Sequence, residues 1–197
     1  MNIIIINTKC ANLFSVHNVL YKLGYNAVIS DEADIISKAD KLLLPGVGTV
    51  TAAMQQLKKK NLVKLIQQST QPILGICLGM QLLGINSEEN SHINTLKIID
   101  IPIKQIKFGN LPLPHMGWNT ISIPKKKHPL FYDIKKNDYF YFAHSYYIDI
   151  CHVTISQTWY GHYFSAVIEY KNFFGVQFHP EKSSTPGEKL IKNFMEM

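Results

Sequence analysis

Arginine is missing from this sequence, and its absence bears on the partners that a basic protein can have. All 20 basic residues are lysines, and with 14 acidic residues they give a formal net charge of +6. Nucleic-acid-binding proteins rely on arginine for paired hydrogen bonds to guanine and phosphate. The lysine runs Lys58–Lys60 and Lys125–Lys127 are typical of solvated helix and loop surfaces. A basic nucleic-acid-binding protein stays open as an alternative, but we expect no nucleic acid among the partners.

Cysteine is scarce as well, and long apolar segments are lacking. The three cysteines, Cys10, Cys77 and Cys151, include no CxxC pair and leave one unpaired in any bridging scheme. The eight histidines form no HExxH or similar ligand pair, so we expect neither a metal nor another cofactor. The apolar run Ile3–Ile6 is too short to span a bilayer and lacks the flanks of a signal peptide. We therefore expect a cytoplasmic protein that does not bind membranes.

Short apolar runs alternate with helical patterns over the first eighty residues. Four runs have the length and composition of buried strands: Ile3–Ile6, Ala27–Ile29, Leu42–Leu44 and Ile73–Ile76. Asn12 can cap a helix after the first run, and the PGVG turn precedes another helix after the third. This alternation is typical of βαβ units around a parallel sheet.

From about Leu96 the sequence becomes β-rich, and a helix closes it from about Pro186. The apolar stretches of this half are Ile98–Ile106, Asn119–Ile123, Tyr139–Phe142, Val153–Ser156, Phe164–Ile168 and Phe173–Phe178. No linker, low-complexity tract or repeat separates the halves. A chain of 197 residues with 46% hydrophobic residues can bury its own core. We predict one α/β domain over residues 1–197, with a mostly parallel central sheet and a β-rich second half.

The segment Gly75–Gly79, GICLG, follows a predicted strand and precedes an apolar helical stretch. This is the arrangement of a nucleophile elbow, with cysteine in the place of serine. Glycines flank Cys77 because a neighbouring side chain would clash in so tight a turn, and a helix N-terminus behind the sulfur favours the thiolate. By itself, the pentapeptide is equally compatible with a small buried cysteine at a strand end.

The segment Phe178–Glu181, FHPE, ends another predicted strand and supplies a base next to a carboxylate. Residues i and i+2 of an extended chain point to the same side, and Pro180 biases His179 toward extended geometry. His179 would accept the thiol proton and return it to the leaving nitrogen, while Glu181 would hold the ring in the useful tautomer. The two segments together predict a triad of Cys77, His179 and Glu181.

Acyl transfer also needs hydrogen-bond donors for the developing oxyanion, each worth about 3 to 4 kcal/mol of the barrier. The N–H of Leu78, directly after the nucleophile, is one candidate. The turn Pro45–Gly48 follows a neighbouring strand and offers the N–H of Val47 or Gly48 as the second. The same turn must connect a strand to a helix in any case, so its glycines alone do not establish a catalytic role.

Six motifs carry a resemblance to one enzyme family. They are LPGVG at 44–48, GICLGMQLL at 75–83, SEE at 87–89, LPHMGWN at 113–119, FAHSYY at 142–147 and GVQFHPEKS at 175–183. On these motifs the chain resembles the triad-type, or class I, glutamine amidotransferases. PGVG and PHMGWN are similar to the glutaminase subunits of imidazole glycerol phosphate synthases. The resemblance covers essentially the whole chain and implies a three-layer α/β fold.

The resemblance also implies roles for the residues at matching positions. The triad positions are Cys77, His179 and Glu181. The positions implied to hold glutamine are Gly46, Gln81, Glu89, Ser145 and Tyr146. The positions implied near the partner and the ammonia exit are Asn12, Tyr141 and Lys182. Two departures stand out: Thr8–Ala11 replaces glycines of many members, which weakens the role of Asn12, and Ala143 replaces a valine, which removes volume near the pocket.

Two of these segments have alternative structural interpretations. PHMGWN can be a proline-bounded loop before a strand, with Trp118 as core filler, or it can belong to the active site or the partner interface. Gln81 can be an exposed polar residue on the helix after Cys77, although its closeness to the nucleophile favours substrate contact.

By this resemblance, the chain hydrolyses glutamine to glutamate and ammonia through a thioester on Cys77. It would form a heterodimer with a cyclase subunit, which uses the ammonia to make imidazole glycerol phosphate and aminoimidazole carboxamide ribotide in histidine biosynthesis. A cysteine peptidase uses the same triad chemistry and stays an alternative. Glutaminase activity without peptide hydrolysis would separate the two.

Overall fold

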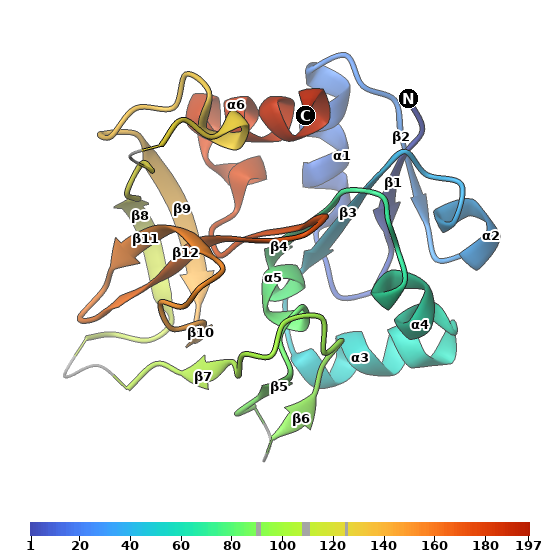
Figure 1. Ribbon diagram of the computed structural model, residues 1–197, viewed down its shortest axis with the longest axis horizontal. Coiled ribbons are helices and arrows are strands. Elements are labelled where there is room, and N and C mark those ends of the chain that lie inside the picture. Colours follow the sequence, from blue (N-terminus) through green and yellow to red (C-terminus); the bar gives the residue numbers. More distant parts are fainter. Residues whose placement is uncertain (90–91, 108–110, 125) are drawn as a thin grey trace.

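A seven-stranded sheet forms the centre of the computed structural model, which describes residues 1–89, 92–107, 111–124 and 126–197 (Figure 1). Lys125 of the second lysine run lies outside these ranges. The strands, in spatial order, are β11 Thr154–Trp159, β12 Tyr163–Tyr170, β13 Phe173–Val176, β4 Ile73–Cys77, β3 Lys41–Gly46, β1 Ile3–Ile6 and β2 Ala27–Ser30. The five strands from β13 to β2 are parallel, and β12 and β11 are antiparallel to their neighbours. The mostly parallel sheet expected from the sequence is confirmed.

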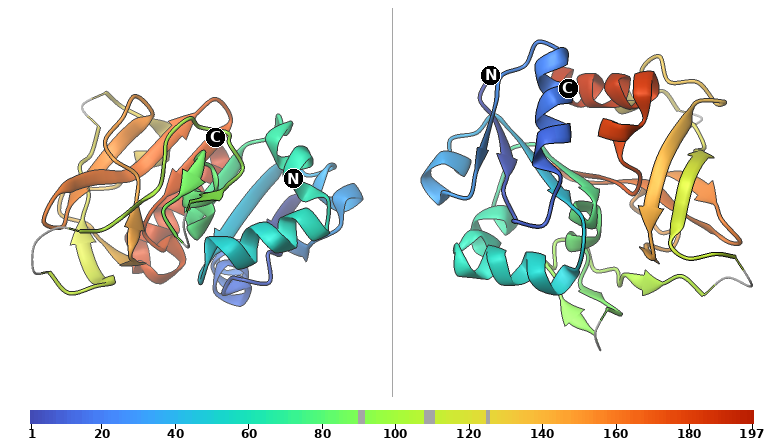
Figure 2. Two further views of the ribbon diagram at one scale, coloured as in Figure 1. Left: turned by 90° about the horizontal axis from the view of Figure 1, so that it is seen from below. Right: turned by 180° about the vertical axis from the view of Figure 1, so that it is seen from behind.

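Helices cover both faces of this sheet and make three layers (Figures 1 and 2). On one face lie α1 Leu13–Lys22 and α6 Ser184–Glu196, and on the other lie α3 Val50–Lys59, α4 Leu62–Gln67 and α5 Leu78–Leu82. Strand β1 shows why both faces are apolar. Ile3 and Ile5 pack in the cluster with α1 and α6, whereas Ile4 and Ile6 pack in the cluster with α3 and α4. A short helix, α2 Ala33–Ile36, lies near strands β1 and β2.

The ends of α1 follow the signals in the sequence. The Oδ1 atom of Asn12 accepts a hydrogen bond from the N–H of Ser15 at 3.3 Å, which satisfies one of the free N–H groups of the first turn. Gly24 follows the helix with φ +86°, a conformation that other residues adopt at a cost. Asn12 is therefore a helix cap on an exposed corner of the molecule.

Short two-stranded sheets make up much of the second half. The pairs are β8 His115–Thr120 with β9 Tyr139–His144, β7 Lys104–Gln105 with β10 Tyr146–Tyr147, and β5 Asn86–Ser87 with β6 Ile93–Asn94. Two expectations were wrong in detail. The stretch Ile98–Ile106 is a strand only at β7, and some of its N–H groups bond to the segment after α5 instead, as Ile99 does to Leu83. The strand expected at Asn119–Ile123 lies earlier, at β8.

The antiparallel pair of β8 and β9, here called the ribbon, has two contrasting faces. Its outer face carries Met116, Trp118, Tyr139 and Tyr141, and the side chains of Met116 and Trp118 are 63% and 54% exposed. Its inner face carries buried side chains: His115, Phe140, Phe142 and His144. The suggestion that Trp118 fills the core is wrong, because alternation along β8 places it outside.

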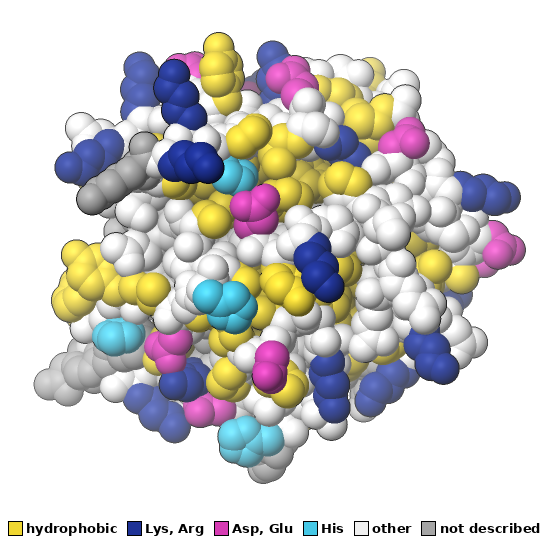
Figure 3. Space-filling view, in the orientation of Figure 1, with side chains coloured by type: hydrophobic (Ala, Val, Ile, Leu, Met, Phe, Trp, Pro, Cys, Tyr) yellow, Lys and Arg dark blue, Asp and Glu magenta, His cyan; other side chains and the backbone are white. Residues whose placement is uncertain are grey.

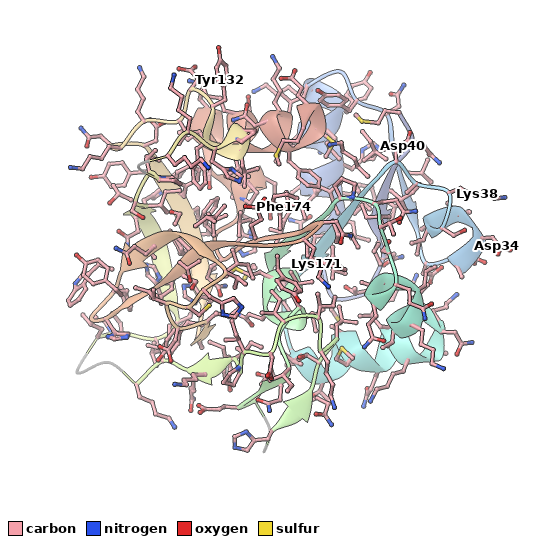
Figure 4. The ribbon with its side chains drawn as sticks, in the orientation of Figure 1. Asp34, Lys38, Asp40, Tyr132, Lys171 and Phe174 are labelled. Atoms are coloured by element: carbon pink, nitrogen blue, oxygen red, sulfur yellow. The ribbon has the colours of Figure 1, made fainter. Side chains whose placement is uncertain are left out.

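Charged residues are spread over the surface. In the space-filling view, lysine side chains occupy several separate places on the visible face (Figure 3). Asp34, Lys38 and Asp40 project from the edge near α2, whereas Phe174 of β13 lies in the interior (Figure 4). Within the described ranges, no helix is long and apolar enough to cross a membrane.

Candidate active site

Cys77 ends the central strand β4 in a sharp turn. Its backbone has φ 52° and ψ −108°, a strained conformation for a residue with a side chain. A Cβ atom on Gly75 would lie 2.7 Å from the backbone of Gly79, and one on Gly79 would collide with the carbonyl oxygen of Leu44. Both positions of the elbow therefore require glycine. Helix α5 behind the sulfur has only five residues, so the helix-dipole effect that we expected is weak.

His179 and Glu181 lie just after β13, the strand beside β4. The Nδ1 atom of His179 is 2.8 Å from Oε1 of Glu181, and both side chains are only 3% exposed. The backbone N–H of His179 donates to the carbonyl oxygen of Tyr141 at 2.8 Å, and the hydroxyl of Ser183 donates to the carbonyl oxygen of His179. The carboxylate thus orients the imidazole, while the two other bonds fix the backbone of His179.

The route by which Glu181 reaches His179 differs from our expectation. Residues Pro180–Lys182 form a turn of 3-10 helix, named η2, rather than extended chain. The carboxylate curls back to the ring because the chain tightens after His179, and the contact does not come from the alternation of a strand.

The charge of His179 is set by its partners. Burial lowers the pKa of His179, but hydrogen bonds to Cys77 and Glu181, together with the negative charges of these groups, raise it to about 10. The ring is therefore protonated at neutral pH and faces the sulfur as an imidazolium. A positive ring at this place is suited to stabilise the negative charge of a sulfur nucleophile.

A cavity of about 200 Å³ opens beside the sulfur. Its lining consists of Val47, Gly48, Cys77, Leu78, Gln81, Glu89, Pro114, Ala143, His144, Ser145 and Tyr146. Hollows of about 460 and 510 Å³ lie elsewhere, around residues 123–133 and 119–163, and neither includes Cys77. The smaller cavity is below the size of a typical drug-sized site and suits a single amino acid.

Glu89 presents an unsatisfied acceptor at this cavity. Its Oε2 atom accepts a hydrogen bond from the N–H of Val50 at 2.9 Å, at the start of α3. Its Oε1 atom is buried and has no hydrogen-bond partner among the described residues. Buried carboxylate oxygens without partners are costly, so this atom is suited to a cationic group of a ligand.

The expected oxyanion donors differ in availability. The N–H of Val47 donates to the carbonyl oxygen of Cys10 at 2.6 Å, so it is not free to point at the cavity in this conformation. Gly48 and Leu78 line the cavity and stay candidates. Gly46 lies behind it, where an added Cβ would be 2.8 Å from Cβ of Leu78. Gly46 therefore permits close packing of β3 on α5, and its contact with substrate stays a prediction.

Gln81 is buried rather than exposed. Its Nε2 atom donates to the carbonyl oxygen of Tyr146 at 2.9 Å and to Oε1 of Gln177 at 3.2 Å. Gln177 in turn places its Nε2 atom 3.8 Å from the sulfur of Cys77. Gln177 was not predicted as a site residue, although its place two residues before His179 in a predicted strand was a signal.

His115 and His144 were not predicted as site residues either. His144 lines the cavity, and its Nε2 atom is 2.9 Å from Nδ1 of His115. Both lie in motifs noted for resemblance, but neither was assigned a role. Of the positions expected at an interface, Lys182 lies over the ring of Tyr141, 5.9 Å from its centroid, and Trp118 contacts the same ring edge-on. Asn12 stands apart as the cap of α1.

Metal binding has no evident place in the described part of the chain. No group of three or more His, Cys, Asp or Glu side chains there is arranged to hold a metal ion. The three cysteines are free thiols.

Comparison with known proteins gives consistent matches. The model of the family "Glutamine amidotransferase class-I" matches residues 5–197. The chain is 67% identical to imidazole glycerol phosphate synthase subunit HisH of Blochmanniella pennsylvanica and 55% identical to that of Pectobacterium atrosepticum, in both cases over all of both chains. A crystal structure of a glutamine amidotransferase superposes with a TM-score of 0.76 at 13% identity, covering 98% of this chain and 97% of that one.

Proposed function

Because the chain belongs to the class I glutamine amidotransferase family, we propose that it is the glutaminase subunit of an imidazole glycerol phosphate synthase, with a role in histidine biosynthesis. It hydrolyses the side-chain amide of glutamine and passes the ammonia to a second subunit. We assign this activity to residues 1–197 as one domain.

One observation carries the chemistry: the imidazole of His179 lies between Cys77 and Glu181 at the edge of a cavity of amino-acid size. In the proposed reaction, the thiolate of Cys77 attacks the amide carbon of glutamine. His179 gives its proton to the leaving nitrogen, so that ammonia departs and a thioester remains. Water, deprotonated by His179, then attacks the thioester and releases glutamate. Glu181 holds the ring and stabilises its charge throughout.

The proposal assigns the remaining lining residues to substrate binding. Oε1 of Glu89 is the acceptor for the α-ammonium group of glutamine, since this buried carboxylate atom at the cavity has no partner in the described part of the chain. Ser145 and Tyr146 form another wall. Gln81 contributes by holding this wall through the carbonyl of Tyr146.

We propose that the partner, the cyclase subunit, binds the outer face of the ribbon in a heterodimer. This face combines Met116 and Trp118 with the Tyr141–Lys182 contact, and it lies directly over the backbone bond between Tyr141 and His179. Exposed aromatic and Met side chains beside one cation are typical of interface centres. The cyclase supplies the ring-closing lyase step, and the cytoplasm stays our prediction for the place of action.

The decisive experiment separates ammonia production from ammonia use. Cys77→Ala, mixed with the cyclase, should lose glutamine-dependent product formation to background, yet still form product from added ammonium at a pH where free ammonia is present. Wild type should do both. With hydroxylamine and glutamine, wild type should also yield the hydroxamate that the variant cannot form.

Cys151→Ala is the matched control, because this thiol lies in a turn bonded to Thr154, outside the cavity. It should behave as wild type in all three assays. Glutamine-dependent synthesis by Cys77→Ala would refute the mechanism. Peptide hydrolysis by wild type without any glutamine-dependent synthesis would instead support the peptidase alternative.

A further inference from the structure

The two histidines on the inner face of the ribbon form a hydrogen-bonded pair whose tautomers follow from their partners. The Nδ1 atom of His144 is 2.8 Å from the carbonyl oxygen of Tyr146 and must donate to it. The Nε2 atom of a neutral His144 is then an acceptor, so Nδ1 of His115, at 2.9 Å, donates to it. When both rings are neutral, each therefore carries its proton on Nδ1.

The surface end of the ribbon fixes the direction of these hydrogen bonds. Oδ1 of Asn119 accepts from the N–H of Thr120 at 2.8 Å, and its Nδ2 donates to the carbonyl oxygen of Trp159 at 2.8 Å. The amide cannot flip without losing both bonds. Its Nδ2 also lies 3.4 Å from Nε2 of His115, which leaves that nitrogen as an acceptor. From Nδ2 of Asn119 through His115 to His144, the donors of this series then point toward the carbonyl of Tyr146.

The inner end of this series of hydrogen bonds reaches the proposed substrate site. The carbonyl oxygen of Tyr146 accepts from two donors, Nδ1 of His144 and Nε2 of Gln81. Gln81 also bonds to Gln177, whose amide approaches the sulfur of Cys77. The pair thus determines the position of a carbonyl that is shared with the residues beside the nucleophile.

The surroundings keep the pair uncharged. His115 is stacked between Phe142 and Tyr160, with ring centroids 4.8 and 4.0 Å away. Burial lowers the pKa of His115 to about 4 and that of His144 to about 3. The charges of His115 and His179 lower the pKa of His144 further, and the hydrogen bond to Tyr146 opposes them. No carboxylate of the described residues contributes to either shift.

We propose that His115 and His144 are a neutral positioning pair, which holds the carbonyl of Tyr146 and the amide of Gln81 in the geometry that binds glutamine. This inference rests on the proposed glutaminase function. It assigns the pair no part in proton transfer, so its loss acts on substrate binding rather than on the chemical step.

Three variants, assayed as glutaminases in complex with the cyclase, test the positioning role. His144→Leu removes the donor to Tyr146 and should raise KM for glutamine about tenfold while kcat stays within about twofold. His144→Asn places an amide nitrogen near the position of Nδ1 and should return KM to within about threefold of wild type. His115→Phe keeps the stacking between Phe142 and Tyr160 but frees Nε2 of His144, and should raise KM by about threefold.

The tautomers are tested independently of activity. Nitrogen-15 NMR of the imidazoles should show both rings neutral, with the proton on Nδ1, at pH 6. A charged ring or an Nε2–H tautomer would overturn the proposal, as would a folded His144→Leu with unchanged KM or a His144→Asn no better than His144→Leu. A wild type without glutaminase activity would overturn the proposed function itself, and the positioning role with it.

Discussion

The triad and the ribbon both contain buried histidines near the sulfur of Cys77, yet these histidines are in opposite charge states. His179 faces a thiol and a carboxylate, and its pKa is raised to about 10. His115 and His144 bond to each other, an amide and a carbonyl, and burial lowers their pKa values to about 4 and about 3. Burial alone therefore does not decide the charge of a histidine. The hydrogen-bond partners decide the charge. The charge in turn decides whether the ring can transfer a proton or only orient its neighbours.

The largest effect on activity should come from removing the carboxylate of Glu181, the partner that raises the pKa of His179. In Glu181→Gln, His179 loses its negative partner and its fixed tautomer, so kcat should fall by about four orders of magnitude with KM for glutamine nearly unchanged. Steady-state kinetics with the cyclase measures it. The control is Glu188→Gln, whose ion pair with Lys22 lies on the surface. A loss of less than tenfold in Glu181→Gln would show that His179 does not depend on its carboxylate.

The next largest effect should be a loss of stability when the close packing of the elbow is disturbed. Gly79→Ala drives a methyl group into the carbonyl of Leu44 and should lower the free energy of unfolding by about 3 kcal/mol. Gly24→Ala is the control, because its added Cβ meets no atom within 4 Å. Its only destabilising effect is the left-handed φ, which should lower the free energy of unfolding by about 1 kcal/mol. Urea unfolding compares the two. Equal losses would mean that backbone conformation, and not close packing, requires glycine at the elbow.

The outer face of the ribbon should matter for assembly and not for folding. Trp118→Ala should weaken cyclase binding about thirtyfold, the equivalent of about 2 kcal/mol, with little change in the stability of the isolated chain. Trp159→Ala is a matched control, because both tryptophans are 54% exposed and Trp159 lies on β11. Calorimetric titration of the cyclase would decide. Similar affinities for the two variants would exclude the outer face as the interface.

The smallest effect is a difference in pH dependence. The pKa values of His115 and His144 are lowered in the folded state, so their contribution is complete above pH 6.5 and is lost as the pH falls through about 4 for His115 and about 3 for His144. The pKa of His179 is raised, so its contribution is complete below pH 6.5 and is lost as the pH rises through about 10.

Unfolding by urea at pH 6.5 and 4.5 should therefore show a smaller acid loss for His115→Phe than for wild type, by about 1 kcal/mol. Between pH 8 and 10 the two proteins should lose stability in parallel, because His179 is unchanged. An identical acid loss in both proteins would mean that His115 is not held neutral by the fold.

The two regions also differ in how far the sequence predicts them. The strands β1 to β4 follow from short apolar runs, which are local signals. The triad of Cys77, His179 and Glu181 was predicted because the segments GICLG and FHPE each end a predicted strand. The two faces of the ribbon could not be predicted from such local signals. In HMGWN the polar His115 and Asn119 turn inward while Trp118 turns outward, the reverse of the usual burial pattern.

Long-range hydrogen bonds account for the remaining differences. The bond from Val47 to Cys10 joins two loops, and no feature of PGVG indicates that one of its N–H groups is already occupied. The burial of Gln81 depends on the carbonyl of Tyr146, which a distant strand supplies. Partners far apart in the chain set these positions, and a single sequence does not record them.

The position of β13 in the central sheet has a consequence for the order in which the protein is made. Ile73 pairs with Phe173, so the nucleophile stands on a strand whose neighbour leaves the ribosome a hundred residues later. Closing so long a loop is slow, and the edge of β4 stays open during synthesis. A chain interrupted before Phe173 holds a cysteine without its base, and no fragment of the N-terminal half can be a partly active enzyme. Activity appears only as the final tenth or so of the chain folds into place.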